Sequence, residues 1–367
     1  MYSNLEKAIH KKRVLVAPLD WGLGHATRCI PLIRLLQQSG CEVIIASNGE
    51  QLSLLKSEFP GIQTILLNGY NVRYARNKRW LALKILGQAP KILLSIRNEQ
   101  RWLQKTIKQL HIDIVISDNR FGLYTKQIPC IFITHQLRIK AAYTWLQNLI
   151  QTINYSFINR FNECWVPDFE NGFNIAGDLS HPEKMPAIPV KYTGVLSRFE
   201  TAESDTIKFE YLSILSGPEP QRTLLEQKLL TIAPKLNGKM LLLRGKPGSV
   251  EEIKGTGNCT IINHLPAKDM QQAFAESKFI ISRCGYTTVM EVLSLRKKSL
   301  LIPTPGQTEQ KYLAVHLMEQ GLCYSCSQED DLIGHINKIN EYDYKLPSLM
   351  QSTLANVVND FIKLHFA

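Results

Sequence analysis

Residues 278–314 read "KFIISRCGYTTVMEVLSLRKKSLLIPTPGQTEQKYLA" and alternate two short apolar runs with two stretches of helical spacing. Short apolar runs separated by helices are typical of parallel strands in an α/β layer. The same alternation recurs along the chain, as "RVLVAPL", "EVIIAS", "DIVISD" and "CIFITH" in the first half and as "YLSILSG" and "KMLLLRG" in the second. The sequence therefore predicts two α/β layers in tandem.

The alternation stops across residues 168–210, where Gly, Pro, Asn and Ser are frequent, and we interpret that stretch as an interdomain crossing. A chain of 367 residues also exceeds the size at which one hydrophobic core keeps growing. We predict two doubly wound, Rossmann-like domains that face each other across a cleft, residues 1–190 and 191–345. Residues 346–367 have the pattern of an amphipathic helix, which we expect to pack back on the first domain.

The composition is 44% apolar and 20% charged, which indicates a globular protein with substantial cores. The longest apolar runs are too short to span a bilayer and the N-terminus lacks the layout of a signal peptide, so we expect a cytoplasmic location. Eight scattered cysteines are typical of reduced thiols. Cys323 and Cys326 form a lone C-x-x-C with no second pair and no histidine cluster, and the chain has no Asp-x-Asp triplet. We expect no bound metal and no cofactor.

The net charge of +11 is uneven, because residues 1–196 hold 24 Lys and Arg against 13 Asp and Glu, which is the whole excess. Within this half, residues 70–108 carry ten basic residues and one acid, Glu99, interleaved with apolar side chains. A basic amphipathic segment suits an anionic membrane surface or an acidic ligand. The alternative is a pair of core-covering helices with a solvated basic face. Nothing in the pattern points to nucleic acid.

The turn after the strand at 278–282 contains Ser282, Arg283 and Gly285 and leads into Thr287 and Thr288. Backbone N–H groups and hydroxyls at a helix N-terminus favour bound phosphate. Glu291 lies nearly two helical turns further on, where its carboxylate can accept hydrogen bonds from a vicinal diol such as a ribose. The next strand ends in "PTPGQTEQ", which brings the polar pair Glu309 and Gln310 to the same edge of the sheet.

The first strand of the chain ends in "DWGLGHATR", with Gly22, Gly24 and His25 in the turn. Glycines let the backbone approach a ligand closely, and a neutral imidazole can accept a proton near pH 7. A histidine that only caps the helix or contacts phosphate is the alternative. Asp118 and His135 end two further strands, and either could be the base or could orient His25.

The motif of residues 282–291 resembles the S-R-x-G-x-x-T-V-x-E signature of glycosyltransferase family 28, a family with the GT-B fold. Its best-known members transfer N-acetylglucosamine to a lipid-linked peptidoglycan precursor or galactose to diacylglycerol. The resemblance implies that Glu291 holds the uridine ribose, that Glu309 and Gln310 contact the donor sugar, and that Leu265 in "INHLP" contributes to the uracil site.

The sequence departs from the family at two places. Glu309 stands where the peptidoglycan enzymes have glutamine, which affects the identity of the sugar. The first loop of the second domain reads "SGPEPQR", and its prolines remove two backbone donors. The resemblance implies that Ser216, Gly217 and Arg222 then carry more of the diphosphate binding.

We therefore expect an inverting, metal-independent transfer of a sugar from UDP to an acceptor hydroxyl. A lipid-linked acceptor would place the enzyme peripherally on the inner face of the membrane. One alternative is a hydrolase that uses water as acceptor, because "GLGHATRC" is close to the Gly-Gly-His-x-x-Arg-Cys turn of the nucleotide-sugar hydrolases of nonulosonate biosynthesis. A second alternative is a non-catalytic nucleotide-sugar-binding module.

Overall fold

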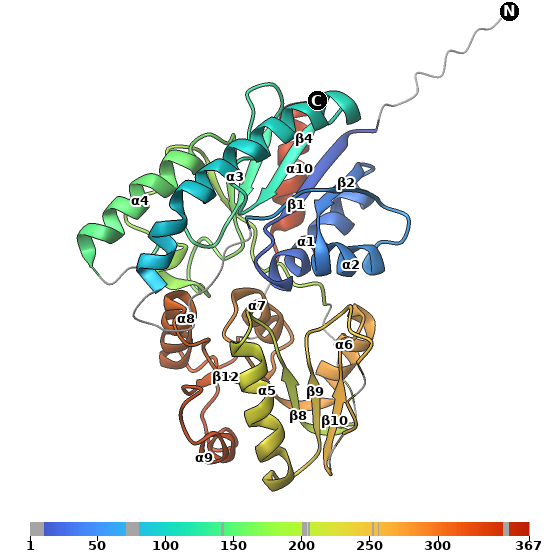
Figure 1. Ribbon diagram of the computed structural model, residues 1–367, viewed down its shortest axis with the longest axis vertical. Coiled ribbons are helices and arrows are strands. Elements are labelled where there is room, and N and C mark those ends of the chain that lie inside the picture. Colours follow the sequence, from blue (N-terminus) through green and yellow to red (C-terminus); the bar gives the residue numbers. More distant parts are fainter. Residues whose placement is uncertain are drawn as a thin grey trace, which may run out of the picture.

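Two parallel β-sheets lie one above the other in the computed structural model, the first built from the N-terminal half of the chain and the second from the C-terminal half (Figure 1). The structure describes residues 11–70, 81–140, 143–199, 204, 206–251, 253–255, 257–347 and 352–366.

Seven strands form the first sheet in the order β3-β2-β1-β4-β5-β6-β7. They are β1 (Arg13–Pro18), β2 (Glu42–Ser47), β3 (Gln63–Leu66), β4 (Ile114–Asp118), β5 (Cys130–Ile133), β6 (Glu163–Val166) and β7 (Val190–Tyr192). The central strand β1 pairs in parallel with β2 and β4, so that Val16 lies between Ile45 and Ile116. Its apolar side chains are buried on both faces, as the unbroken apolar runs predict.

Six strands form the second sheet in the order β10-β9-β8-β11-β12-β13. They are β8 (Phe209–Ile214), β9 (Met240–Leu243), β10 (Cys259–Ile262), β11 (Ser277–Ser282), β12 (Lys298–Leu301) and β13 (Tyr324–Ser325). The strand order reverses between β8 and β11, as it does between β1 and β4 in the first sheet. Ligands of doubly wound folds bind outside the carboxyl ends of the strands at such points. The predicted α/β class with two Rossmann-like layers is confirmed.

Helices connect most of the consecutive strands, whereas loops join β4 to β5 and β9 to β10. The first half has α1 (Leu23–Gln38), α2 (Gly49–Glu58), α3 (Leu81–Leu110), α4 (Thr144–Ile158) and the short η2 (Gly177–Leu179). The second half has α5 (Gln221–Ile232), η3 (Ala233–Lys235), α6 (Ala267–Ala275), α7 (Tyr286–Ser294), α8 (Thr308–Glu319), α9 (Leu332–Lys338) and α10 (Leu354–Phe366). Among the helices that the structure describes, none has both the length and the apolar character needed to cross a bilayer.

Part of the predicted interdomain crossing, residues 168–210, belongs to the first sheet instead. Asp168 is fully buried and its carboxylate accepts backbone N–H groups of Ile175 and Ala176 at 2.9 Å, which folds the Gly- and Asn-rich stretch into a compact turn. The chain then adds β7 beside β6. The predicted domain bound at 190/191 thus falls at the start of β7. The local composition indicates a loop, but the buried carboxylate holds that loop against the sheet.

A shared hydrophobic core joins the two sheets. Helix α1 packs against α7, and one cluster of buried residues runs from Val14 and Ile33 of the first half to Val289, Leu293 and Leu313 of the second. The two layers are therefore in direct apolar contact along α1 and α7.

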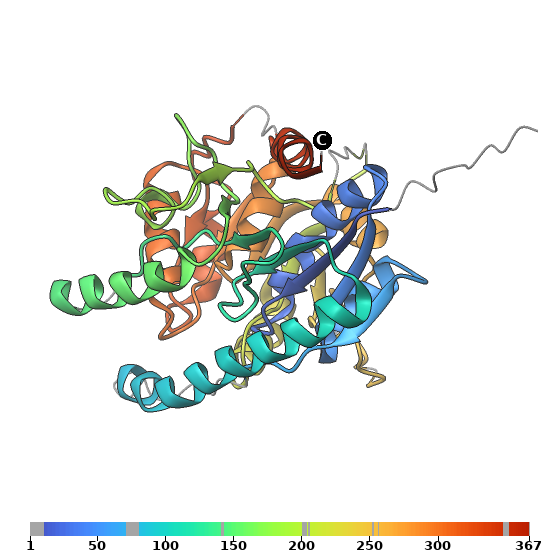
Figure 2. The ribbon, with the colours of Figure 1, turned by 90° about the horizontal axis from the view of Figure 1, so that it is seen from above.

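Helix α10 returns from the second sheet to the first. It contacts α1 and β7, and Phe361 packs edge-on against Trp165 with ring centroids 5.7 Å apart. Figure 2 shows α10 and α3 on opposite faces of the first sheet. The residues that close this face of the first core thus come from the last turns of the chain.

We expect Phe361→Ala to lower the free energy of unfolding by about 3–5 kcal/mol, because it removes a ring that is only 3% exposed and leaves a cavity beside Trp165. Urea denaturation followed by fluorescence measures this change. Leu364→Ala on the same helix is the control: its side chain is 72% exposed, and the expected change is within about 0.5 kcal/mol. Equal effects of the two substitutions would contradict the docking of α10.

Candidate active site

The turn between β1 and α1 meets the start of α7 at the boundary between the sheets. Gly22 has φ = 80°, a conformation that residues with a side chain rarely adopt. At Gly24, a Cβ atom would lie 3.2 Å from Oγ1 of Thr287, and that hydroxyl donates to the carbonyl of Gly24 at 3.1 Å. The two glycines thus allow the turn and the close approach of the two helices.

Both helix N-termini at this boundary lack side-chain caps. Gly22 is the N-cap of α1 and Gly285 is the N-cap of α7, and neither helix has an acidic residue in its first turn. The first N–H groups of a helix have no partner within the helix, and they carry its positive dipole end. Two such ends beside each other form a favourable environment for a diphosphate.

His25, in the first turn of α1, lies against a buried ion pair. Its Nδ1 atom is 3.0 Å from Oδ2 of Asp118, the last residue of β4. Arg28, one turn further along α1, donates to the same carboxylate through Nε at 2.9 Å and through Nη2. Asp118 and Arg28 are both fully buried, so neither charge is screened by water.

The charges of this group shift the pKa values of its members. Burial raises the pKa of Asp118, but Arg28 and His25 outweigh it and lower the pKa to about 2. Burial lowers the pKa of His25, Asp118 raises it and Arg28 lowers it again, and the net pKa is below 6.5. The imidazole is therefore neutral at pH 7, which a general base requires.

The proton of neutral His25 is best assigned to Nδ1. The carboxylate of Asp118 accepts it there, whereas Nη2 of Arg28, which is also 3.0 Å from Nδ1, already donates to Asp118. This tautomer leaves the lone pair of Nε2 available to accept a proton.

A second histidine continues the network into the other domain. Nδ1 of His135 lies 3.2 Å from Nη1 of Arg28, and Nε2 lies 2.6 Å from Oε1 of Glu309 at the start of α8. The ring stacks on Tyr286 with centroids 4.0 Å apart and an interplanar angle of 4°. Burial raises the pKa of Glu309, but His135, His25 and Arg28 hold it below its usual range. His25, Asp118, Arg28, His135 and Glu309 thus form one polar chain across the boundary.

The predicted ribose acceptor Glu291 faces a residue of the linker. Its Oε1 lies 2.9 Å from Nε of Arg198, but neither atom has a partner in hydrogen-bond geometry. Burial raises the pKa of Glu291, Arg198 lowers it and Glu58 raises it, with a net increase. The neighbouring His264, from the predicted uracil loop, has an unpartnered Nε2.

Two more unpartnered polar atoms lie at the carboxyl ends of the second sheet. They are Nε of Arg283 and Oγ1 of Thr304, and both side chains are buried. Buried polar atoms without partners are rare in proteins and call for an explanation. Of the ten buried side-chain atoms without a partner in the described residues, five belong to the segments where the sequence predicts the nucleotide or to the residue that faces them: those of Arg198, His264, Arg283, Glu291 and Thr304.

Other predicted residues make local contacts. The Oε1 atom of Gln310 accepts the backbone N–H of Thr304 at 2.8 Å, and the hydroxyl of Ser282 donates to the carbonyl of Arg283. Arg222 is held by Glu219 of the turn before α5 and by Glu226 one turn further along the helix.

The last predicted positions lie along loops and helix starts. Leu265 packs at the edge of a core cluster, Ser216 and Thr288 are half-buried, and Gly217 is exposed with φ = 97°. The structure thus brings His25, Asp118, His135, Glu309, Gly24 and Thr287 together, and shows Arg222, Ser282 and Gln310 in local contacts.

Three residues of the site were not assigned a role from the sequence. Arg28 is three positions after His25, and this spacing places the two side chains on one helical face. Tyr286, which stacks on His135 and donates to the carbonyl of Pro167 at 2.6 Å, lies inside the signature itself. Arg198 gives no sequence signal, because its partner Glu291 is 93 positions away.

The chain is similar to known glycosyltransferases in sequence and in fold. Residues 219–364 match the glycosyltransferase family 28 C-terminal domain. An uncharacterized glycosyltransferase of Methanosarcina acetivorans is 22% identical over 349 residues, which cover 86% of this chain and 87% of the relative. The UDP-N-acetylglucosamine–N-acetylmuramyl-(pentapeptide) pyrophosphoryl-undecaprenol N-acetylglucosamine transferase of Sulfurihydrogenibium sp. is 22% identical over 372 residues, with coverage of 95% and 99%.

Among solved structures, the spinosyn rhamnosyltransferase SpnG complexed with thymidine diphosphate superimposes with a TM-score of 0.62 at 14% identity, covering 96% of this chain and 95% of that one. The predicted resemblance to family 28, the GT-B fold and the glycosyltransferase class are confirmed.

We expect Asp118→Asn to lower the free energy of unfolding by about 3–5 kcal/mol, because it leaves the guanidinium of Arg28 buried without an anion. Urea denaturation at pH 7 measures the change. Glu210→Gln is the control, since it breaks the partly exposed pair with Lys278, and a change within about 1 kcal/mol is expected. A similar small change for Asp118→Asn would contradict the role of the buried pair.

The pKa shifts of Asp118 and His25 also determine the direction in which the free energy of unfolding changes with pH. The pKa of Asp118 in the folded protein, about 2, is below its ordinary 3.8, so its contribution is present above pH 3.8 and lost as the pH falls toward 2. The pKa of His25 is also lowered, so the unfolded chain takes up that proton first and stability decreases as the pH falls below 6.5.

Proposed function

We propose that this chain, whose residues 219–364 match the glycosyltransferase family 28 C-terminal domain, transfers a sugar from a uridine diphosphate donor to an acceptor hydroxyl with inversion. The observation that carries the proposal is the meeting of two uncapped helix N-termini beside a neutral histidine. The solved relative bound to thymidine diphosphate supports a nucleoside diphosphate as the leaving group.

The second domain binds the nucleotide in this proposal. The carboxylate of Glu291 has acceptor capacity that its ion pair with Arg198 does not use in hydrogen-bond geometry, which suits the two hydroxyls of a ribose. The unpartnered Nε2 of His264 lies in the loop where the uracil is expected. Polar atoms that lack partners in the described residues thus have partners in a bound nucleotide.

The first domain activates the acceptor. The acceptor hydroxyl gives its proton to Nε2 of His25 while its oxygen attacks the anomeric carbon, and the bond from that carbon to the diphosphate oxygen breaks. Asp118 stabilises the imidazolium that forms. The electrons leave with the diphosphate, whose charge is met by the N-termini of α1 and α7. No step of this sequence requires a metal ion.

Glu309 selects the sugar. Its side chain is only partly buried, although its carboxylate is held by His135, so one oxygen is able to accept a hydroxyl of the donor. A carboxylate accepts hydrogen bonds only, whereas the glutamine of the peptidoglycan enzymes also donates. We therefore propose a donor sugar that presents a hydroxyl to this position.

We expect His25→Ala to lower kcat by a factor of roughly 10²–10⁴ and to leave the affinity for UDP unchanged. A panel of UDP-sugars with and without acceptor, followed by release of UDP, identifies the donor and measures the rate. His111→Asn is the matched control, because His111 is exposed and asparagine tolerates its φ of 49°.

Three results would redirect the proposal. Full activity of His25→Ala would remove its role as base. Free sugar released at the same rate without any acceptor would identify a hydrolase. Tight binding of UDP with no turnover of any donor would identify a binding module.

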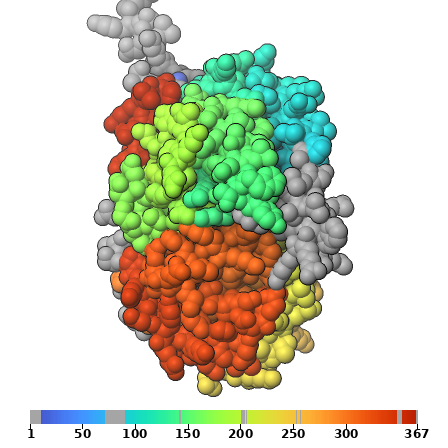
Figure 3. All heavy atoms as spheres, turned by 90° about the vertical axis from the view of Figure 1, so that its left-hand side faces the viewer, coloured from blue at the N-terminus to red at the C-terminus, as the bar shows by residue number. Residues whose placement is uncertain are grey.

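A basic and apolar surface on α3 and α4 suits a lipid-linked acceptor. Residues 71–80 of the predicted segment and the side chains of 81–89 lie outside the described residues. In the described part of α3, the single acid Glu99 points inward and pairs with the buried Arg120 at 2.8 Å, so that the outer face is basic. Figure 3 shows α3 and α4 on one side of the molecule, above the second domain.

The apolar part of this surface lies mostly on α4, which the sequence reasoning did not include. Trp145 is 68% exposed, and Leu149 and Ile153 of α4 and Leu93 and Leu94 of α3 are about half exposed. Tryptophan and leucine beside basic residues are typical of helices that lie at a membrane surface. The undecaprenol-linked acceptor in the name of the Sulfurihydrogenibium relative supports this proposal.

We expect the protein to float with anionic vesicles at low salt and much less at high salt. Each Lys or Arg near such a surface contributes about 1 kcal/mol, so Arg97→Glu with Arg101→Glu weakens binding roughly thirtyfold or more. Trp145→Glu should also weaken vesicle binding, because it removes an exposed apolar side chain of α4. The control is Val250→Glu in the second domain, at a side chain that is 97% exposed. Vesicle binding that does not change with lipid charge, with the double substitution at Arg97 and Arg101 or with Trp145→Glu would contradict a membrane surface here.

A further inference from the structure

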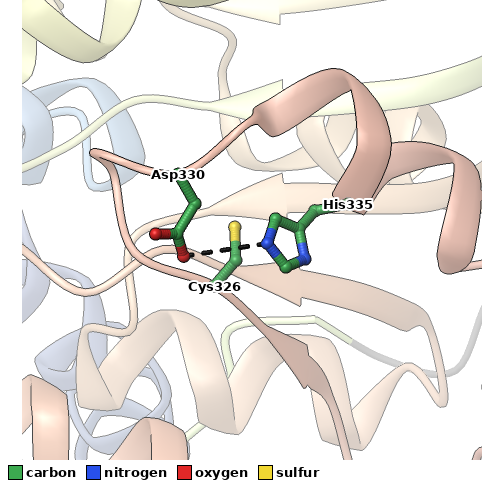
Figure 4. A group of neighbouring side chains, drawn as sticks. All are labelled: Cys326, Asp330 and His335. Atoms are coloured by element: carbon green, nitrogen blue, oxygen red, sulfur yellow. Dashed lines mark ion pairs between the residues drawn. The ribbon is translucent and has the colours of Figure 1, made fainter.

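Three metal-ligating side chains meet at the far edge of the second sheet. Cys326 follows β13, Asp330 lies in the next turn and His335 lies on α9; their ligand atoms are all within 4.8 Å of one another (Figure 4). Oδ2 of Asp330 is 3.7 Å from Nε2 of His335. We propose that these residues bind one divalent transition-metal ion, of which Zn²⁺ best fits the donor set.

The donor atoms have the chemistry that such an ion requires. Thiolate, imidazole and carboxylate are the three protein ligands of Zn²⁺, and three of them leave the fourth tetrahedral position to water. One thiolate and one carboxylate neutralise the two charges of the ion. If the three ligand atoms move about 1 Å closer together, the distances between them match those of a tetrahedral site. The bonds from such ligands to the ion are about 2.0–2.3 Å long.

The surroundings already orient two of the ligands. The hydroxyl of Tyr324 lies 2.9 Å from Nδ1 of His335, so that Nδ1 donates to it and Nε2 keeps its lone pair for the ion. The backbone N–H of Ser327 donates to Asp330 at 2.7 Å, which directs the carboxylate toward the other two ligands. Cys326 is buried and Asp330 is exposed, so the ion has a rigid inner ligand and an open outer side.

This inference replaces the expectation that the sequence pair Cys323 and Cys326 binds no metal. Cys323 is 1% exposed and belongs to the shared core, so it is not part of the group. The partners of Cys326 are four and nine positions further along the chain. The C-x-x-C pair therefore contains only one of the proposed ligands, Cys326, and the other two lie outside that pattern.

The metal site is connected to the donor signature through one residue. Gln328 lies between the ligands Cys326 and Asp330, and its Oε1 accepts from Nη2 of the buried Arg283 at 2.5 Å. An ion that draws the two ligands together fixes the turn that carries Gln328, and thereby the orientation of Arg283. This second step rests on the proposed function, in which Arg283 lies at the nucleotide site.

Co²⁺ is the probe for the site itself. As it binds, the thiol of Cys326 loses its proton to solvent and a sulfur–cobalt bond forms, which produces a thiolate-to-cobalt charge-transfer band and tetrahedral d–d bands. We expect one equivalent of Co²⁺ to produce them in the wild-type protein and in Cys41→Ser, the matched control. Cys326→Ser should lose the charge-transfer band, and His335→Gln should weaken binding at least about tenfold.

The control and the second measurement separate the two steps. Circular dichroism and thermal unfolding check that each variant is folded. Absence of the charge-transfer band in the wild-type protein, or its persistence in Cys326→Ser, overturns the metal site. For the link to Arg283, calorimetry should show UDP binding at least about fivefold tighter with Zn²⁺ than without it, and no such gain in His335→Gln.

Equal UDP affinity with and without bound Zn²⁺ overturns the link to Arg283. Failure of UDP to bind in either state counts against the proposed function instead, and the cobalt spectrum decides the metal site independently of it.

Discussion

The contact between the first turns of α1 and α7 fixes the positions of the other active-site groups. The hydroxyl of Thr287 donates to the carbonyl of Gly24, and a Cβ at position 24 would crowd that hydroxyl at 3.2 Å. That approach places two positive helix ends side by side and puts His25 at the boundary of the sheets. Since α1 also carries Arg28, the same contact positions the buried ion pair of the first domain beside the second.

The pKa values of the site depend both on burial and on the charges that are buried beside each group. Arg28 and Asp118 neutralise each other in a place that water does not reach, and this keeps His25 uncharged while one carboxylate oxygen still faces its ring. Glu309 extends the network across the boundary through His135. A substitution of Asp118 or Arg28 therefore changes the pKa of His25 as well as its own contacts.

Most of the fold could be predicted from the sequence, because parallel strands buried on both faces leave unbroken apolar runs and their helices leave a regular period. The strand β7 could not, because three residues within a Gly- and Pro-rich stretch carry no period and owe their place to the buried Asp168. Of the site, His25, Asp118 and Glu309 were predictable from their positions after strands. The Arg198–Glu291 pair and the Cys326–Asp330–His335 group depend on how distant segments meet, which spacing does not indicate.

The return of α10 to the first sheet has a consequence for folding during synthesis. Phe361 and Val358 complete a core whose other walls are made more than 150 residues earlier, at Trp165 and along α1. On the ribosome, the first sheet is therefore completed only after the segment that forms α10 has been translated and has left the exit tunnel. Until then its uncovered apolar face is available to chaperones, and translation that stopped before α10 would produce both sheets but leave this face of the first one open.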